Sequence, residues 1–184
     1  VFGLQYVDAW GEWGGSTALI EYARRHPDRL LHIVVSGAQF FSPDEVQDLI
    51  VNYAPEIKPL SHGGHLLECW HRVRNESLFW PWYREESGSV ISEMPRLDAE
   101  DLTQRFLALL QSAPDQARIH RELFAYPLAG SIAGNNAKIL LTAATWDPNK
   151  SHTEAAAAHS KGHFVLLPDR QKDWAPTLLE FFNQ

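Results

Sequence analysis

The segment with the clearest chemical potential is Trp10–Gly15, which reads Trp-Gly-Glu-Trp-Gly-Gly. It lies between an apolar run, residues 4–9, and an amphipathic stretch, residues 16–25. A strand, a glycine-rich corner and a helix in this order are the layout of a nucleophile elbow, in which a reactive side chain is held on a sharp turn at the end of a strand. We place Glu12 at the tip of this turn. A carboxylate there would lie near a helix N-terminus, whose dipole and free N–H groups favour an anion.

A carboxylate in this position has two chemical uses. It could attack a carbon atom and form a covalent intermediate, or it could act as a general base or acid. A third reading is a helix-terminal carboxylate that remains after an activity has been lost. The sequence therefore predicts where the chemistry lies more clearly than which reaction takes place.

The composition limits the classes of protein to which the chain can belong. Its 184 residues, 45% of them hydrophobic, are enough for one domain with a substantial core. A formal net charge of −7 argues against nucleic acid or an anionic membrane as a partner. No apolar run approaches the roughly 20 residues that cross a bilayer. Cys69 is the only cysteine, which excludes an internal disulfide, so we expect a reducing, cytoplasmic compartment.

Both ends of the chain read as alternating strands and helices. Apolar runs at 4–9 and 31–35 predict short buried strands, and a helix over 16–26 is ended by Pro27. Further elements are expected near the C-terminus, as strands at 138–143 and 164–167 and helices at 153–159 and 174–182. The alternation favours a parallel sheet flanked by helices, the α/β class.

The middle of the chain lacks any strand pattern. Ser42 and Glu45 form a capping box before a helix. Further helices are expected at 62–75, 99–111 and 114–124. We therefore expect a helical cap or lid over residues 41–136, inserted into a sheet domain made of residues 1–40 and 137–184.

This order of elements, with the late Asp-Pro at 147–148, resembles the α/β-hydrolase superfamily from its fifth strand onward. The resemblance implies a partial α/β-hydrolase fold, a mostly parallel sheet flanked by helices with an inserted cap, in which the N-terminal strands are missing from this chain. The strand at 4–9 would then expose a hydrophobic edge, which sheets normally avoid. The first residues are neither a signal peptide nor an initiator methionine. We expect a complementary chain, or the cleaved N-terminal half of a precursor, to complete the sheet.

The resemblance assigns roles residue by residue. Glu12 falls where the nucleophile stands, and Trp10 replaces the first glycine of the elbow. The N–H of Trp13 would be an oxyanion donor. Asp147 matches the acid of the catalytic triad, and Lys172 occupies the place of the histidine, where it could form an ion pair with Asp147. The sequence from residue 12 to 15 shares the nucleophile-Trp-Gly-Gly pattern of haloalkane dehalogenases and epoxide hydrolases.

The expected cap combines aromatic and polar residues, which suits a small, partly apolar ligand, although the same aromatics would equally form the core of the cap. The expected substrate-binding residues are Trp10, His65, Trp70, Trp80, Trp82 and Tyr83. Arg72 and Arg74 could anchor a ligand carboxylate, but we expect them to be exposed to solvent. His62 and His65 could touch one metal ion, yet no third ligand is apparent, so we expect neither a metal nor a cofactor.

The leading interpretation is an α/β-hydrolase-fold enzyme subunit that acts on a small organic substrate in a capped pocket. Its reaction would be a hydrolysis, or a proton transfer of the lyase or isomerase type. The alternative is a non-catalytic subunit that serves ligand binding or assembly with a partner chain. In a third possibility the active site belongs to the partner, and this chain supplies only the lid.

Overall fold

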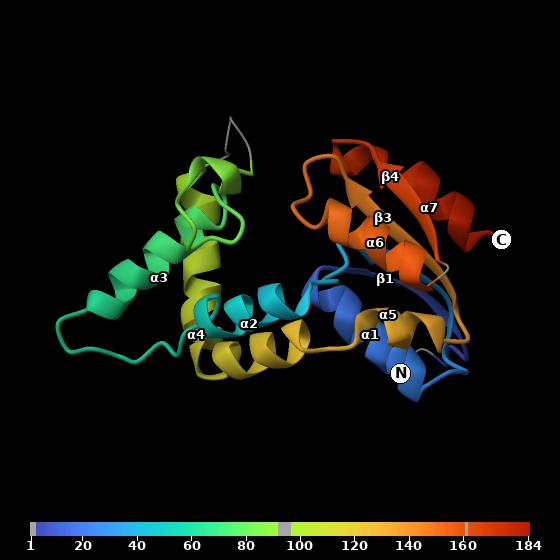
Figure 1. Ribbon diagram of the computed structural model, residues 1–184, viewed down its shortest axis with the longest axis horizontal. Helices are drawn as coiled ribbons and strands as arrows, with labels where there is room; N and C mark the ends of the chain where they lie inside the picture. Colours follow the sequence, from blue (N-terminus) through green and yellow to red (C-terminus); the bar gives the residue numbers. More distant parts are fainter. Residues whose placement is uncertain (1–2, 92–96, 161) are drawn as a thin grey trace. The chain divides into compact units, whose positions relative to one another are not determined.

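The computed structural model describes residues 3–91, 97–160 and 162–184 and divides into two compact units (Figure 1). The sheet unit is formed by residues 1–41 and 126–184, and the helical unit by residues 42–125. From the sequence we expected the insertion to extend to residue 136. The helical unit instead ends at Ala125, because Leu128 and Ile132 pack in the core of the sheet unit.

Over its described residues the sheet unit contains four parallel strands in the order β1-β2-β3-β4. The strands are β1 (Val7–Glu12), β2 (Leu30–Ser36), β3 (Lys138–Ala144) and β4 (His163–Leu167). The helices are α1 (Gly14–Arg25), α5 (Leu128–Ala133), α6 (Lys150–Ser160) and α7 (Ala175–Phe182), with a short 3₁₀ turn, η2 (Gln171–Asp173), before α7. Every strand and long helix expected for this unit is present, and the sequence analysis did not predict α5 or the short η2 turn.

Side chains that alternate along the central strands build a core on each face of the sheet. Ile33 and Leu141 point to the face covered by α1, α5 and α6, whereas Val34 and Leu140 pack with α7 on the other face. All four side chains are almost completely buried. β2 and β3 are therefore mostly apolar, as expected for strands covered on both faces.

β1 lies at the edge of the sheet and, in the described part of the chain, pairs only with β2. We expected a buried strand over residues 4–9. The strand instead runs from Val7 to Glu12 and is largely exposed, with Val7 39% and Trp10 41% accessible, and Tyr6 just before it is 47% accessible. The correction has a physical reason, because a strand with one neighbour leaves half of its surface uncovered. The expectation of an exposed hydrophobic edge is confirmed.

In the described residues of the helical unit, three helices and a 3₁₀ turn are present. They are α2 (Pro43–Asn52), α3 (Gly64–Asn75), η1 (Ser87–Ser89) and α4 (Ala99–Phe124). The predicted capping box is present, since Ser42 Oγ accepts the Glu45 N–H and Glu45 Oε2 accepts the Ser42 N–H. Cys69 and Val73 of α3 pack against Leu102 and Leu109 of α4 to form the core of this unit.

α4 differs from expectation because it is one helix and not two. We predicted a break before Pro114, since proline lacks the N–H that continues the hydrogen-bonding pattern. The helix passes through Pro114 without ending. Packing against α3 therefore outweighs the lost hydrogen bond. In the described ranges no helix is both long and apolar enough to span a membrane.

The core of the sheet unit gives a stability prediction. Leu141 is fully buried, so Leu141→Ala should lower the free energy of unfolding by about 2–5 kcal/mol through lost burial and the cavity left behind. Leu179→Ala is the control, because this α7 side chain is 57% exposed. Urea denaturation followed by circular dichroism measures both. Equal effects of the two substitutions would contradict this description of the core.

Candidate functional site: a modified nucleophile elbow

The tip of the elbow is Trp13. Its backbone has φ 48° and ψ −121°, a conformation that residues with side chains rarely adopt. Trp13 stands between the end of β1 at Glu12 and the start of α1 at Gly14. A strained turn of this kind between strand and helix is where an elbow carries its reactive residue. The assignment of Glu12 to the nucleophile position is therefore wrong by one residue.

The glycines confirm this register. Gly11, Trp13 and Gly15 have the spacing of the G-x-S-x-G elbow, with tryptophan in the place of serine. A Cβ added to Gly11 would lie 2.8 Å from the Gly15 carbonyl oxygen and 2.9 Å from Ser16 Cα, so only glycine allows this approach of strand and helix. Gly11 is thus the first glycine of the elbow, and the expectation that Trp10 replaces it is wrong.

The predicted oxyanion donor is also wrong. The Trp13 N–H donates to the Ser36 carbonyl oxygen at 2.8 Å, so it is already used within the sheet unit. The donor in an elbow is the N–H of the residue after the tip, which here is Gly14. Gly14 begins α1, and the first N–H groups of a helix have no acceptor within it.

The Trp13 indole lies beside Asp147, the residue expected as the triad acid. A Cβ added to Gly37 would lie 2.7 Å from Asp147 Oδ2 and 2.7 Å from Trp13 Nε1, so both groups crowd this glycine. Burial raises the pKa of Asp147, and this effect outweighs hydrogen bonds from the Asn149 N–H and the Trp13 side chain, which lower the pKa. A tryptophan therefore fills the position next to the acid.

Lys172 does not pair with Asp147. Its side chain is exposed in η2, and the described residues include no ion pair between the two. The β4–α7 loop instead brings Asp169 to the segment that carries Asp147. Trp146 donates its Nε1–H to the Asp169 carbonyl oxygen at 2.8 Å, and Thr145 donates its hydroxyl to Asp169 Oδ1.

Glu12 lies one residue before the tip, at the exposed end of β1. Partial desolvation raises the pKa of its carboxyl group, and the negative charge of Asp147 raises the pKa further. Glu12 and Asp147 are therefore two carboxyl groups close enough to interact, and each holds its proton more tightly than an isolated carboxyl group. Trp10 lies on the same strand, where its Nε1–H donates to Ser36 Oγ at 2.8 Å.

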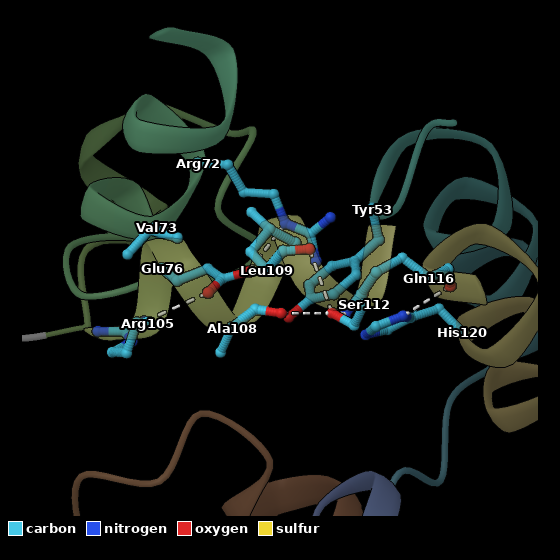
Figure 2. Close-up of a pocket in the computed structure, with 10 residues that line it drawn as sticks. All are labelled: Tyr53, Arg72, Val73, Glu76, Arg105, Ala108, Leu109, Ser112, Gln116 and His120. Atoms are coloured by element: carbon cyan, nitrogen blue, oxygen red, sulfur yellow. Dashed lines mark hydrogen bonds and ion pairs between the residues drawn. The ribbon is translucent and has the colours of Figure 1, made fainter. Parts of the chain in front are cut away.

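The helical unit contains a separate cavity of about 310 Å³, lined by ten residues that come mainly from α3 and α4 (Figure 2). Arg72 of α3 is one of them and is only 5% exposed, so the expectation of a solvent-exposed arginine is wrong. Its Nε donates to Glu76 Oε1 at 3.0 Å. Sequence reasoning missed Tyr53, Gln116 and His120, because they gather here only through the packing of α2, α3 and α4.

None of the cap residues predicted to bind substrate is among the ten residues that line this cavity. Each of them has a structural contact within the helical unit instead. Trp82 donates its Nε1–H to the Tyr53 carbonyl oxygen at 2.8 Å, and the Trp80 ring meets the Tyr53 ring edge-on. The Tyr83 hydroxyl donates to an Asp48 oxygen at 2.6 Å. The Trp70 ring packs edge-on against the Phe106 ring, and His65 Nδ1 accepts a hydrogen bond from the Leu60 N–H. These residues hold the unit together, and their role in binding remains a prediction.

Comparison with known proteins places the fold. No family model matches the chain, and no curated protein matches it. Solved structures do match, and three of them are similar to this chain as follows. Bromoperoxidase from Bacillus anthracis has a TM-score of 0.68 at 12% identity, over 98% of this chain and 68% of that one. An acetylester hydrolase from Corynebacterium glutamicum has a TM-score of 0.63 at 14% identity, over 100% of this chain and 63% of that one. The α/β-hydrolase enzyme MGS-M2, from a Medee basin deep-sea metagenome library, has a TM-score of 0.61 at 13% identity, over 99% of this chain and 66% of that one.

The chain thus has a partial α/β-hydrolase fold and spans about two thirds of the length of the proteins it resembles. This confirms the predicted fold class. At such low identities the likeness concerns the fold alone, and function must be argued from the site.

The raised pKa of Asp147 predicts a pH dependence of stability. The folded state binds this proton more tightly than the unfolded chain, so the contribution of Asp147 to stability is fully present below the unfolded pKa of about 3.9 and is lost as the pH rises through the folded pKa. Asp147→Asn removes this titration. The free energy of unfolding of the unmodified protein should therefore fall, relative to Asp147→Asn, as the pH rises above about 3.9.

Urea unfolding at a series of pH values measures this difference. Asp28→Asn, in the exposed turn after α1, controls for the loss of one acidic group. Parallel profiles for the unmodified protein and Asp147→Asn would show that the environment of Asp147 has been described wrongly.

Proposed function

We propose that the protein is a non-hydrolytic member of the α/β-hydrolase fold that binds a small organic molecule. The observation that carries this proposal is Trp13 at the tip of the elbow. Covalent catalysis needs a side chain that attacks the substrate, such as a hydroxyl, thiol or carboxylate. The indole N–H of tryptophan is only a donor.

The second step of a covalent hydrolysis also lacks its parts. Histidine is the usual group that activates water, and residues 168–174 between β4 and α7 contain none. Asp147 instead contacts the Trp13 indole. An intermediate formed at this elbow would have no evident means of release.

The carboxyl pair supports a second candidate, proton transfer by Glu12. Desolvation and the charge of Asp147 both raise the pKa of Glu12, which moves it toward the range in which a carboxyl group exchanges protons near neutral pH. The Gly14 N–H could stabilise an anion formed beside it. This candidate keeps the catalytic role of Glu12 but replaces nucleophilic attack by acid–base chemistry.

The two candidates differ in what Glu12→Gln should do. The non-hydrolytic candidate predicts no hydrolysis of nitrophenyl acetate or nitrophenyl butyrate above the buffer rate, and no effect of Glu12→Gln on that rate, because the elbow has no nucleophile.

The proton-transfer candidate instead predicts that Glu12 catalyses exchange of the methyl protons of pyruvate in deuterated water, which NMR measures. That exchange should fall by about 10²–10⁴-fold in Glu12→Gln.

Glu154→Gln, on the exposed surface of α6, is the matched control. Ester hydrolysis that disappears in Glu12→Gln but not in Glu154→Gln would overturn the non-hydrolytic proposal.

We also propose that the edge of β1 is covered by further β-strands, supplied by a complementary chain or by the other half of a cleaved precursor. An exposed strand edge with apolar side chains is a template for pairing. Tyr6, Val7 and Trp10 make this edge apolar. The longer chains of the similar structures also support further strands.

A charge on this edge tests the proposal. We expect the purified chain to self-associate or to carry a second polypeptide in light-scattering measurements after size exclusion. Val7→Lys should shift it toward the 20.9 kDa of one chain, because lysine on an edge strand discourages pairing. Val51→Lys, at a 60% exposed position of the helical unit, is the control. A monodisperse 20.9 kDa species of the unmodified chain would refute the proposal.

A further inference from the structure

We infer that the cavity of the helical unit binds a small, partly apolar monocarboxylate, with Arg72 as the residue that holds the carboxylate. The inference deepens the proposed binding function by naming the class of ligand, and it rests on residues that are separate from the elbow. All residues used in the argument belong to the helical unit.

The first observation is an unsatisfied cation. Arg72 is only 5% exposed, and its Nε is paired with Glu76, but its buried Nη1 has no hydrogen-bond partner among the described residues. Leaving a buried charged donor unpaired costs more than an ordinary hydrogen bond contributes. Figure 2 shows the Arg72 side chain extending from α3 toward Tyr53, within the group of residues that lines the cavity. An anion in the cavity would supply the missing acceptor.

The second observation is the balance of charge in the cavity. Arg72 and Arg105 share one carboxylate, since Arg105 Nη2 lies 3.2 Å from Glu76 Oε2. Burial lowers the pKa of His120, and the positive charge of Arg72 lowers it further, so His120 adds little charge at neutral pH. The lining therefore has one guanidinium more than carboxylate. The nearby Asp101 is 61% exposed, lies 3.9 Å from Arg105, and does not line the cavity.

The third observation is that the guanidinium of Arg72 is held in place. Its central carbon lies 5.4 Å from the centre of the Tyr53 ring and 5.7 Å from that of Trp82. Aromatic faces at this distance attract a guanidinium and leave its edge free for a planar acceptor. A carboxylate matches this geometry.

The rest of the lining defines the remainder of the ligand. Val73, Leu109 and the ring of Tyr53 present apolar surface. Gln116 Oε1 is a buried acceptor without a partner, while its Nε2 donates to Ser112 Oγ at 2.8 Å. A hydroxyl on the ligand would satisfy it. The cavity, about 310 Å³, is at the small end of ligand sites. A phosphate monoester would bring up to two negative charges against one excess cation, so a hydroxylated monocarboxylate fits better.

The experiment is a titration of the full chain with mandelate, followed by calorimetry. Mandelate combines a carboxylate, a hydroxyl and an apolar ring. Hexanoate lacks the hydroxyl, mandelamide is the uncharged analogue, and inorganic phosphate tests the other source of anionic oxygens. We expect mandelate to bind, hexanoate more weakly, and mandelamide and phosphate not detectably.

Arg72→Gln should weaken mandelate binding by about ten- to a hundredfold, the effect of a lost hydrogen bond to a charged group. Arg74→Gln, at an exposed position of the same helix, should leave the affinity unchanged. Because Arg72→Gln could disturb packing, Ala108→Phe provides a second variant that narrows the cavity without removing a hydrogen bond. It should abolish binding while the helical circular dichroism signal is retained.

Three results would overturn the inference. Mandelate and hexanoate could both fail to bind the folded chain, mandelamide or phosphate could bind as tightly as mandelate, or Arg72→Gln and Arg74→Gln could be equivalent. Glu12→Gln separates this inference from the proposed function. If that substitution abolishes mandelate binding and Arg72→Gln does not, the ligand lies at the elbow, which keeps the binding function but excludes this cavity.

Discussion

The sheet unit depends on the close contact between the end of β1 and the start of α1. Gly11 lies so near the Gly15 carbonyl and Ser16 that no side chain can be added there. The buried Ser16 hydroxyl lies 2.9 Å from both the Gly11 and the Ser36 carbonyl oxygens and so joins strand, turn and helix. This contact forces the strained backbone of the residue between them, Trp13, and thereby decides which side chain stands at the tip.

The fold was readable from the sequence because its signals are local. Apolar runs bounded by glycine and proline gave β2, β3 and β4 almost to the residue, and the Ser42 capping box gave the start of α2. Two local signals misled. Residues 4–9 look apolar enough to be buried, and Pro114 looks like a helix break. Both predictions were wrong because tertiary contacts outweigh the local signal. In the described residues β1 has a paired neighbour on one side only, and α4 packs against α3.

The candidate site was harder to predict, for reasons of register and distance. The segment from Gly11 to Gly15 allows two readings one residue apart, and only the backbone conformation of Trp13 distinguishes them. The predicted ion pair of Asp147 and Lys172 is absent from the described residues because Lys172 lies exposed to solvent in η2, and the β4–α7 loop contacts the Asp147 segment through Asp169 instead. The burial of Arg72 could not be predicted from the sequence, since it depends on how Tyr53, Trp82 and α4 pack around α3.

The strained backbone at Trp13 has a consequence for redesign of the elbow. A backbone in this region costs of order 1–3 kcal/mol and persists only where the surrounding structure fixes it. Here the close approach of Gly11 to Gly15 and Ser16 holds the turn with a tryptophan at its tip. Replacing Trp13 alone by serine would place a hydroxyl at the tip, yet residues 168–174 between β4 and α7 would offer it no histidine as a proton acceptor. A working nucleophile at this turn would therefore need at least two coordinated substitutions.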